Sequence, residues 1–366
     1  MPPRAPAPPA ALIPLYGHAA LQTQLRAAAA RGALPASLLF HGPRGIGKQR
    51  LALWLGQLLL CENADRAPCN ECKQCRFTAR LTHPDLHWYF PRPRPKGSDP
   101  SAEDINADQA EAVAERVEAG GLYPTPGGDE AIFVATVRAI VHSAILSPAL
   151  ARRKVYIIGD AERMVPQAGA EQAANAFLKL LEEPPADTFI ILTSSESGAL
   201  LPTIKSRVVS LRVTPLLPAD VRALLNDPAV AARVAVEHRE LSESDLLTLA
   251  GGAPGRLFGQ DALAAAAAGA RTILDAATSG DDAKVFRAAF VQGTAKARGR
   301  FADTLDVLTV LLHQRAQAFA DRDERGARGA AIAVDAVERA KEMATNNGNP
   351  ELITASLLRE ISPLLS

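Results

Sequence analysis

Short apolar runs alternate with longer amphipathic segments over the first part of the chain. Five short runs have the length and residue types of strands, and they lie at 37–41, 83–90, 155–158, 188–193 and 208–213. Segments with apolar residues at helical spacing lie around them, at 18–31, 48–60, 107–119, 132–146 and 167–183. Strands that alternate with helices in this way predict an α/β domain built on a parallel five-stranded sheet with helices on both faces.

The strand pattern stops at Pro215, and the rest of the chain reads as helices. Short helical segments at 218–238 and 241–249 precede a glycine-rich turn, and the alanine-rich chain from Gln260 onward has broad apolar stripes. We therefore expect four parts. They are a disordered leader at 1–14, an α/β domain at 15–213, a small helical domain at 214–258 and an all-α bundle at 259–366.

The first strand leads into Gly42-Pro-Arg-Gly45-Ile-Gly47-Lys48, and a helix follows directly. The spacing Gly-x4-Gly-Lys between a strand and a helix is typical of a phosphate-binding loop. Glycines allow backbone N–H groups to converge on an anion at the helix N-terminus, and Lys48 would add a positive charge beside the outer phosphates. A glycine turn without a ligand is the alternative.

Two positions that usually serve Mg²⁺ are changed in this sequence. Gln49 stands where a Ser or Thr hydroxyl normally ligates the metal. The strand at 155–158 is followed by Gly159, where a metal-anchoring Asp is expected, and Asp160 comes one residue later. The loop is therefore predicted to cradle phosphate but to hold the metal poorly.

All four cysteines of the chain lie close together, as Cys61-x7-Cys69-x2-Cys72-x2-Cys75. Two overlapping C-x2-C steps with a fourth thiol nearby predict a closed, structural zinc site without catalysis, within an insert at 61–75. A redox pair or inert thiols are the alternatives. His83 and His87 could also bind a metal, but we expect neither to do so.

The segment 91–128 is polar and rich in proline, so we expect a partly disordered surface insertion. Its basic residues could meet phosphates, although a solvated tip is the expected state. The whole chain has 40 basic and 40 acidic residues and no formal net charge, which argues against a protein that coats nucleic acid unaided. The sequence shows no membrane span or signal peptide, so we expect a cytoplasmic location.

Several of these motifs together resemble bacterial DNA polymerase III clamp-loader subunits of the AAA+ group, and the delta-prime subunits most of all. The motifs are the phosphate loop, the cysteine insert, His83-Pro-Asp85, Lys154-Val-Tyr-Ile-Ile158, Asn175 to Pro185, and Leu201-Pro-x-Ile-x-Ser206-Arg207. They cover roughly residues 15–260, and the helical remainder is similar only in order and length. Val208 stands where the family usually has a cysteine after Arg207.

The resemblance implies an AAA+ domain, a helical lid and a C-terminal collar in a hetero-pentamer with gamma/tau-type ATPase subunits and a delta subunit. That complex loads the sliding clamp onto primed DNA, and its nucleotide sites lie between subunits. Arg207 would then be an arginine finger that acts on the neighbouring ATPase, and Arg256 would be the lid arginine that senses nucleotide. Arg256 would be vestigial or purely structural once hydrolysis is lost.

With Gln49 and Gly159 at the metal positions, the resemblance favours a stator, a non-catalytic subunit of the polymerase holoenzyme that binds ATP or ADP weakly or not at all. Two alternatives stay open at this point. The first is an active gamma/tau-type AAA+ ATPase. The second is a freestanding, zinc-stabilised nucleic-acid-binding protein, which the neutral net charge disfavours.

Overall fold

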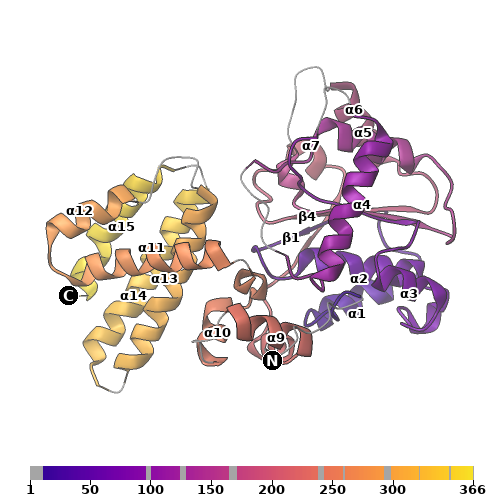
Figure 1. Cartoon of the computed structure of the whole chain (residues 1–366). Coiled ribbons are helices and arrows are strands. Elements are labelled where there is room, and N and C mark those ends of the chain that lie inside the picture. Colours follow the sequence, from indigo (N-terminus) through magenta and orange to yellow (C-terminus); the bar gives the residue numbers. More distant parts are fainter. Residues whose placement is uncertain are drawn as a thin grey trace, which may run out of the picture. The chain divides into compact units, whose positions relative to one another are not determined.

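The chain forms two compact units, residues 1–240 with 252–258, and residues 241–251 with 259–366. The computed structural model describes residues 11–95, 100–123, 129–164, 171–237, 243–258, 260–291, 298–320, 322–345 and 348–365 (Figure 1). Most of the leader expected at 1–14 lies outside these residues, as do parts of the insertion expected at 91–128.

A parallel five-stranded sheet forms the centre of the first unit. Its order is β2-β3-β4-β1-β5. The strands are β1 (Ser37–His41), β2 (Leu86–Tyr89), β3 (Lys154–Ile158), β4 (Thr188–Ser194) and β5 (Val209–Arg212). All four strand pairs are parallel, which confirms the predicted sheet. Because β1 lies between β4 and β5, the phosphate loop that follows it starts near the middle of the carboxyl edge.

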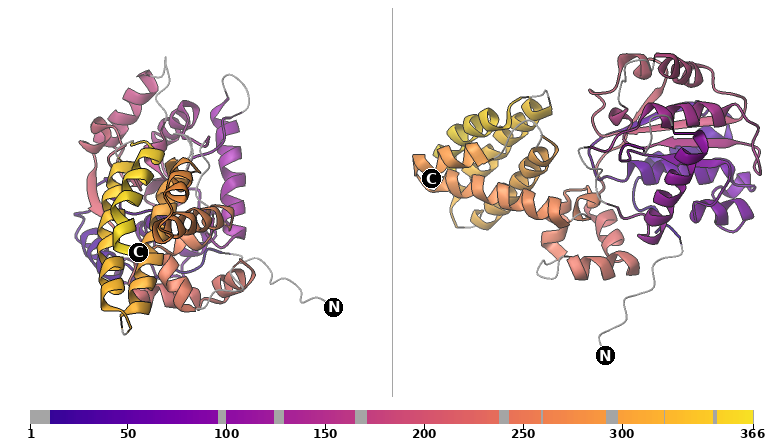
Figure 2. Two further views of the ribbon diagram at one scale, coloured as in Figure 1. Left: turned by 90° about the vertical axis from the view of Figure 1, so that its left-hand side faces the viewer. Right: turned by 45° about the horizontal axis from the view of Figure 1, so that its top comes forward.

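Helices cover both faces of the sheet, as predicted (Figures 1 and 2). On one face, α5 (Val134–Ala144), α6 (Glu171–Glu182) and α7 (Pro202–Lys205) share a buried core with strand residues such as Tyr156 and Leu192. On the other face, α2 (Lys48–Leu60) packs so closely that a Cβ on Gly56 would lie 2.8 Å from Leu86. Alternate strand residues therefore serve opposite layers.

The cysteine insert at 61–75 directly follows α2. It contains the 3₁₀ turn η1 (Ala64–Arg66) and the helix α3 (Lys73–Ala79). The helix α1 (Ala19–Ala30) supports the insert, because the Nε atom of Arg26 donates a hydrogen bond to the carbonyl of Ala67 at 2.9 Å. The insert is thus attached to the α/β layers on the side where α1 and α2 pack.

Two buried charges fix the chain before β3. The carboxylate of Asp85 accepts hydrogen bonds from the N–H groups of residues 149–151 at 2.6 to 2.8 Å. Burial alone would raise the pKa of Asp85, but these backbone donors outweigh it and lower the pKa. Lys154 donates to carbonyls at the end of α5. The strand predicted from residue 83 therefore begins only at Leu86, since Asp85 is engaged in this turn.

The helix α4 (Ala102–Glu118) begins earlier than the predicted residue 107. Ser101 and Asp104 form a reciprocal capping box at its N-terminus, a signal that explains the earlier start. Ile105, Gln109 and Ala112 are buried beneath it. The described part of the segment expected as a surface insertion therefore contributes a packed helix.

The stretch predicted as helical at 218–238 is divided into α8 (Pro218–Leu225) and α9 (Pro228–Glu237). Pro228 starts the second helix, and the side chain of Asp227 caps it by accepting from the N–H of Ala229 at 3.0 Å. Tyr16 donates to the same carboxylate at 2.8 Å. The 3₁₀ turns η2 (Ala161–Arg163) and η3 (Pro254–Leu257) complete the described part of this unit.

The second unit is helical, as predicted for the C-terminal region. Its described helices are α10 (Glu243–Ala250), α11 (Gln260–Thr278), α12 (Asp282–Val291), α13 (Arg298–Phe319), α14 (Glu324–Thr345) and α15 (Pro350–Leu365). They share one core of alanine and large aliphatic side chains. The unit includes α10, so the two units do not coincide with the domains expected at 214–258 and 259–366. Those domain boundaries stay a prediction. In the described part of the chain, no helix combines the length and the apolar character that crossing a bilayer requires.

Candidate functional site

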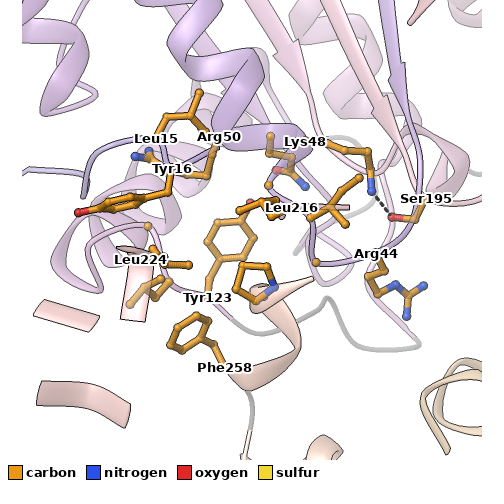
Figure 3. A pocket seen from close by; sticks show the side chains of 18 of the residues that line it. Leu15, Tyr16, Arg44, Lys48, Arg50, Tyr123, Ser195, Leu216, Leu224 and Phe258 are labelled. Atoms are coloured by element: carbon orange, nitrogen blue, oxygen red, sulfur yellow. Dashed lines mark hydrogen bonds between the residues drawn. The ribbon is translucent and has the colours of Figure 1, made fainter. Parts of the chain in front are cut away.

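A cavity of about 160 Å³ lies at the carboxyl edge of the sheet, beside the phosphate loop (Figure 3). The loop and α2 supply its polar end, and residues 13–16, residues 121–123, α8 and η3 supply largely apolar walls. Figure 3 shows the rings of Tyr123 and Phe258 facing the interior. Of the predicted nucleotide residues, Gly45, Gly47, Lys48, Gln49 and Asp160 line the cavity.

Lys48 is buried and is held by its own loop. Its ammonium group donates to the carbonyls of Gly42 and Pro43 at 2.9 and 2.7 Å and to the hydroxyl of Ser195 at 2.9 Å. Burial lowers the pKa of Lys48 to about 8, against the opposing effect of the Asp160 and Glu162 carboxylates. The three donor hydrogens of the ammonium are therefore already engaged.

The turn η3 packs directly on the phosphate loop. Gly45 has a φ of +81°, a left-handed conformation that suits glycine, and its carbonyl accepts from the N–H of Gly255 at 2.9 Å. A Cβ on residue 255 would lie 2.8 Å from the Cα of Gly45. The backbone N–H of Arg256 also lies beside Gly45, although Arg256 does not line the cavity. Two glycines thus allow the closest approach of these backbones.

Gln49 stands at the loop position where a Ser or Thr hydroxyl normally ligates Mg²⁺. Its amide donates to a carboxylate oxygen of Asp160 at 3.0 Å and accepts from the indole N–H of Trp88 at 3.0 Å. A Cβ on Gly159 would lie only 2.3 Å from the Oε1 atom of Gln49. The two unusual residues are therefore sterically coupled, because the glutamine amide fills the space that the absent side chain of residue 159 leaves.

Two carboxylates border this amide. Asp160 has a left-handed backbone with φ of 49°, and its N–H donates to Thr193 at 3.2 Å. Glu162 accepts from the N–H of Ser195 at 2.9 Å, while its Oε2 atom is buried with no hydrogen-bond partner among the described residues. Burial, and then the charge of Asp160, raise the pKa of Glu162. The pair provides negative charge, but Gln49 already engages one of the oxygens.

Sequence reasoning missed several residues of this site. Trp88 and Tyr123 contact it from a strand and from a loop after α4, and Arg50 lines it from α2. Trp88 had been assigned only to a strand pattern, and Tyr123 lay in a segment expected at the surface. Arg50 is half-buried in α2, between the buried residues Gln49 and Leu51.

Arg207 lies at the amino end of β5, away from the phosphate loop of its own chain. Its guanidinium pairs with Glu182 at 3.0 Å and donates to the carbonyl of Thr203 at 3.0 Å, and its side chain is 30% exposed. Val209 pairs with Leu38, whereas the phosphate loop begins only after His41. Because each strand residue adds about 3.3 Å, Arg207 and the loop lie at opposite ends of the strands, Arg207 at the amino ends and the loop at the carboxyl ends.

The four cysteines form one cluster, in which all Sγ atoms lie within 4.8 Å of one another. The distances from Cys61 to Cys72 and from Cys69 to Cys75 are 4.0 Å. Tetrahedral zinc with bonds of about 2.3 Å requires sulfur separations of about 3.8 Å. The cluster therefore fits one tetrahedral metal ion such as zinc.

Backbone donors and neighbouring residues define the surroundings of this cluster. Hydrogen bonds from the N–H groups of residues 71 and 72 lower the pKa of Cys69 to about 6, whereas burial raises the pKa of Cys61 and of Cys75. His83 bonds the side chain of Gln74 at 2.6 Å, and His87 stacks on Tyr156 at 4.6 Å between ring centroids. Neither histidine belongs to the cluster of four thiols.

The known proteins to which this chain is similar in sequence are named as subunits of DNA polymerase III. A family model described as "DNA polymerase III, delta subunit" matches residues 17–216. A Pseudomonas aeruginosa protein named DNA polymerase III subunit delta′ is 36% identical over 232 residues, which are 61% of this chain and 55% of that protein. The Bacillus subtilis protein of the same name is 29% identical over 197 residues, 54% and 47% of the two chains. The chain spans about half the length of these relatives.

Similarity extends to a second class of subunit. The DNA polymerase III subunit gamma/tau of Mycobacterium tuberculosis strain H37Rv is 30% identical over 218 residues, 59% of this chain and 31% of that protein. A solved Thermotoga maritima structure described as a DNA polymerase III, gamma subunit-related protein has 18% identity and a TM-score of 0.41, with 94% of this chain and 99% of that chain covered. The range matched by the family model includes the phosphate loop, the cysteine cluster and Arg207.

Substitution of Gly159 by alanine should reveal its coupling to Gln49. We expect Gly159→Ala to lower the free energy of unfolding by about 1 to 3 kcal/mol, because the Gln49 amide must give up its two hydrogen bonds. In a Gln49→Ala background the same change should cost little. Denaturant unfolding of the four proteins measures the coupling, with Gly198→Ala, whose Cβ would meet open space, as the control. An equal cost in both backgrounds would contradict the steric coupling.

Loss of one thiol should empty the metal cluster. We expect metal analysis to find about one zinc ion per chain, and Cys72→Ser to lose it and to melt at a lower temperature, because three thiolates hold zinc poorly. His83→Asn, a change beside the cluster but outside it, should retain the metal. Full zinc content in Cys72→Ser would point to a different ligand set.

Proposed function

Because this chain belongs to the DNA polymerase III delta-prime subunit family, we propose that it is a clamp-loader subunit that helps to place the sliding clamp on primed DNA during replication. It works as a stator in a hetero-pentamer with gamma/tau-type ATPase subunits and a delta subunit. The observation that carries this role is the Gln49 amide, which fills the space beside Gly159 where a metal-binding side chain would lie.

The stator role follows from the chemistry of phosphoryl transfer. That reaction depends on Mg²⁺ to neutralise charge on the β- and γ-phosphates. Here Gln49 provides a neutral amide instead of a hydroxyl, and its N–H group binds Asp160. Lys48, the group expected to contact the outer phosphates, donates to its own loop. The subunit therefore hydrolyses no ATP, and it binds ATP or ADP weakly or not at all.

The role of Arg207 is to complete the site of a neighbouring subunit. An arginine finger must reach the γ-phosphate of another chain, so it cannot lie beside the phosphate loop of its own chain. The position of Arg207 at the opposite ends of the strands meets this requirement. Its partial exposure and its contacts with Glu182 and Thr203 keep the guanidinium fork on the surface.

The remaining site residues have supporting roles in this proposal. Gly42, Gly45 and Gly47 retain the loop that would surround a phosphate, and Arg256 lies beside Gly45 as a structural remnant of a nucleotide-sensing arginine. The four cysteines hold a structural zinc ion that stabilises the end of α2. In this proposal none of these residues takes part in a chemical step.

The purified chain should show no ATP hydrolysis above background in the presence of Mg²⁺. Lys48→Ala should leave this background unchanged, because Lys48 has no metal-bound triphosphate to act on. A steady-state assay with both proteins measures the difference. Turnover that disappears in Lys48→Ala would instead establish an active gamma/tau-type ATPase.

Removal of the proposed finger should impair the neighbouring ATPase. In a reconstituted loader, we expect Arg207→Ala to reduce hydrolysis at the adjoining site by about 10³-fold or more. Arg207→Lys should remain impaired, because an ammonium group lacks the planar fork. Single-turnover hydrolysis with clamp and primed DNA measures the effect.

Arg212→Ala is the matched control, since Arg212 is exposed at the other end of the same strand. This variant should hydrolyse ATP at the rate of the unmodified loader. Full stimulated hydrolysis by Arg207→Ala in an intact assembly would exclude the finger.

A further inference from the structure

The helix α4 and the residues that follow it have no part in the function proposed above, yet they are firmly attached to the edge strand β2. Asn106 accepts a hydrogen bond from the hydroxyl of Tyr89 at 2.9 Å, and Gln109 donates to the carbonyl of Trp88 at 2.9 Å. Arg92, just after the strand, pairs with Asp108 at 3.0 Å. These contacts fix both the position and the rotation of α4.

The last turn of α4 carries a half-buried arginine, Arg116, among aromatic rings. The guanidinium carbon of Arg116 lies 4.8, 3.2 and 3.7 Å from the ring centroids of Trp88, Phe90 and Tyr123. Its Nη1 atom is buried and has no hydrogen-bond partner among the described residues. Cation–π attraction to three rings therefore compensates for the water that this guanidinium loses. Arg116 thus joins α4, the end of β2 and the loop residue Tyr123.

This cluster reaches the former metal position through a single side chain. Trp88, which lies under Arg116, donates its indole N–H to Gln49 at 3.0 Å. Gln49 in turn donates to Asp160. The inserted helix therefore takes part in holding the amide in the space that Gly159 leaves.

The same segment also reaches the helices after the sheet. The carbonyl of Leu122 accepts a hydrogen bond of 2.6 Å from the Nη1 atom of Arg233 in α9. The guanidinium of Arg233 also lies 5.4 Å from the ring centroid of Phe258, which lines the pocket from the residue after η3. The carbonyl of Gly120 accepts from the N–H of Ile13 at 3.0 Å. Ile13 and α9 thus both contact residues 120–123, and Arg233 extends the contact to Phe258.

We propose that residues 100–123 form a built-in lock that holds α8, α9 and η3 on the α/β domain and fixes Gln49 in the metal position. A nucleotide and its metal would normally bridge the two walls of such a pocket. Here Arg116, Leu122 and Arg233 provide the bridge from within the chain. The lock keeps these elements in one position whether or not a nucleotide is present, and this property does not depend on membership of a clamp loader.

Hydrogen–deuterium exchange of the full-length chain tests the lock. In the unmodified protein, exchange in residues 218–237 should be unchanged by excess ATP with Mg²⁺. Arg233→Met keeps the length of the side chain but removes the donor to Leu122, so exchange there should become about tenfold faster. Peptides from β1 and α2 should exchange at the original rate.

A matched control separates the bridge from the ion pair within α9. Glu237→Gln removes the charge that pairs with Arg233 at 2.7 Å but leaves the bond to Leu122, so it should behave like the unmodified protein. Arg116→Met tests the other end and should also accelerate exchange in residues 218–237. If that variant fails to fold, Arg233→Met still decides the question.

Two results would overturn the proposal. The first is protection of residues 218–237 when ATP and Mg²⁺ are added to the unmodified chain, since the nucleotide would then be the bridge. The second is unchanged exchange in Arg233→Met. Because the measurement uses the isolated chain, neither result bears on Arg207 or on assembly with other subunits.

Discussion

The side chain of Gln49 occupies a volume that a side chain at residue 159 would otherwise need, and much of the first unit depends on this exclusion. A glycine without a partner would leave a polar gap beside the half-buried residues Asp160 and Glu162. The amide fills that gap and satisfies both Asp160 and the indole of Trp88. The absence of a side chain at residue 159 and the packing of the Gln49 amide are thus one structural event.

The neighbouring groups adapt to the same event. Lys48 donates to two carbonyls of the loop and to Ser195, and Gly255 lies against Gly45, so the loop is closed by intramolecular contacts. Charge balance is also internal, because the Lys48 ammonium and the Arg116 guanidinium both lie in the field of Asp160.

The sequence predicted the sheet more completely than it predicted the candidate site. Apolar runs identified all five strands, and the spacing of glycines and cysteines located the phosphate loop and the metal cluster, because these features depend on residues close together in the chain. The contacts of Trp88 with Gln49 and of Leu122 with Arg233 join residues far apart in sequence, so no local pattern could reveal them. The early start of α4 could have been predicted from the sequence, because its capping box is formed by Ser101 and Asp104, which are close together in the chain.

The order of the strands has a consequence for how the chain is made. β1 lies between β4 and β5, so it has no partner in the sheet until residues 188–212 have been synthesised. The cysteine cluster, in contrast, closes within residues 61–75, directly after α2. Local closure costs less chain entropy than pairing distant strands. In a growing polypeptide the four thiols can therefore come together at the end of α2 long before β1 is paired on either side.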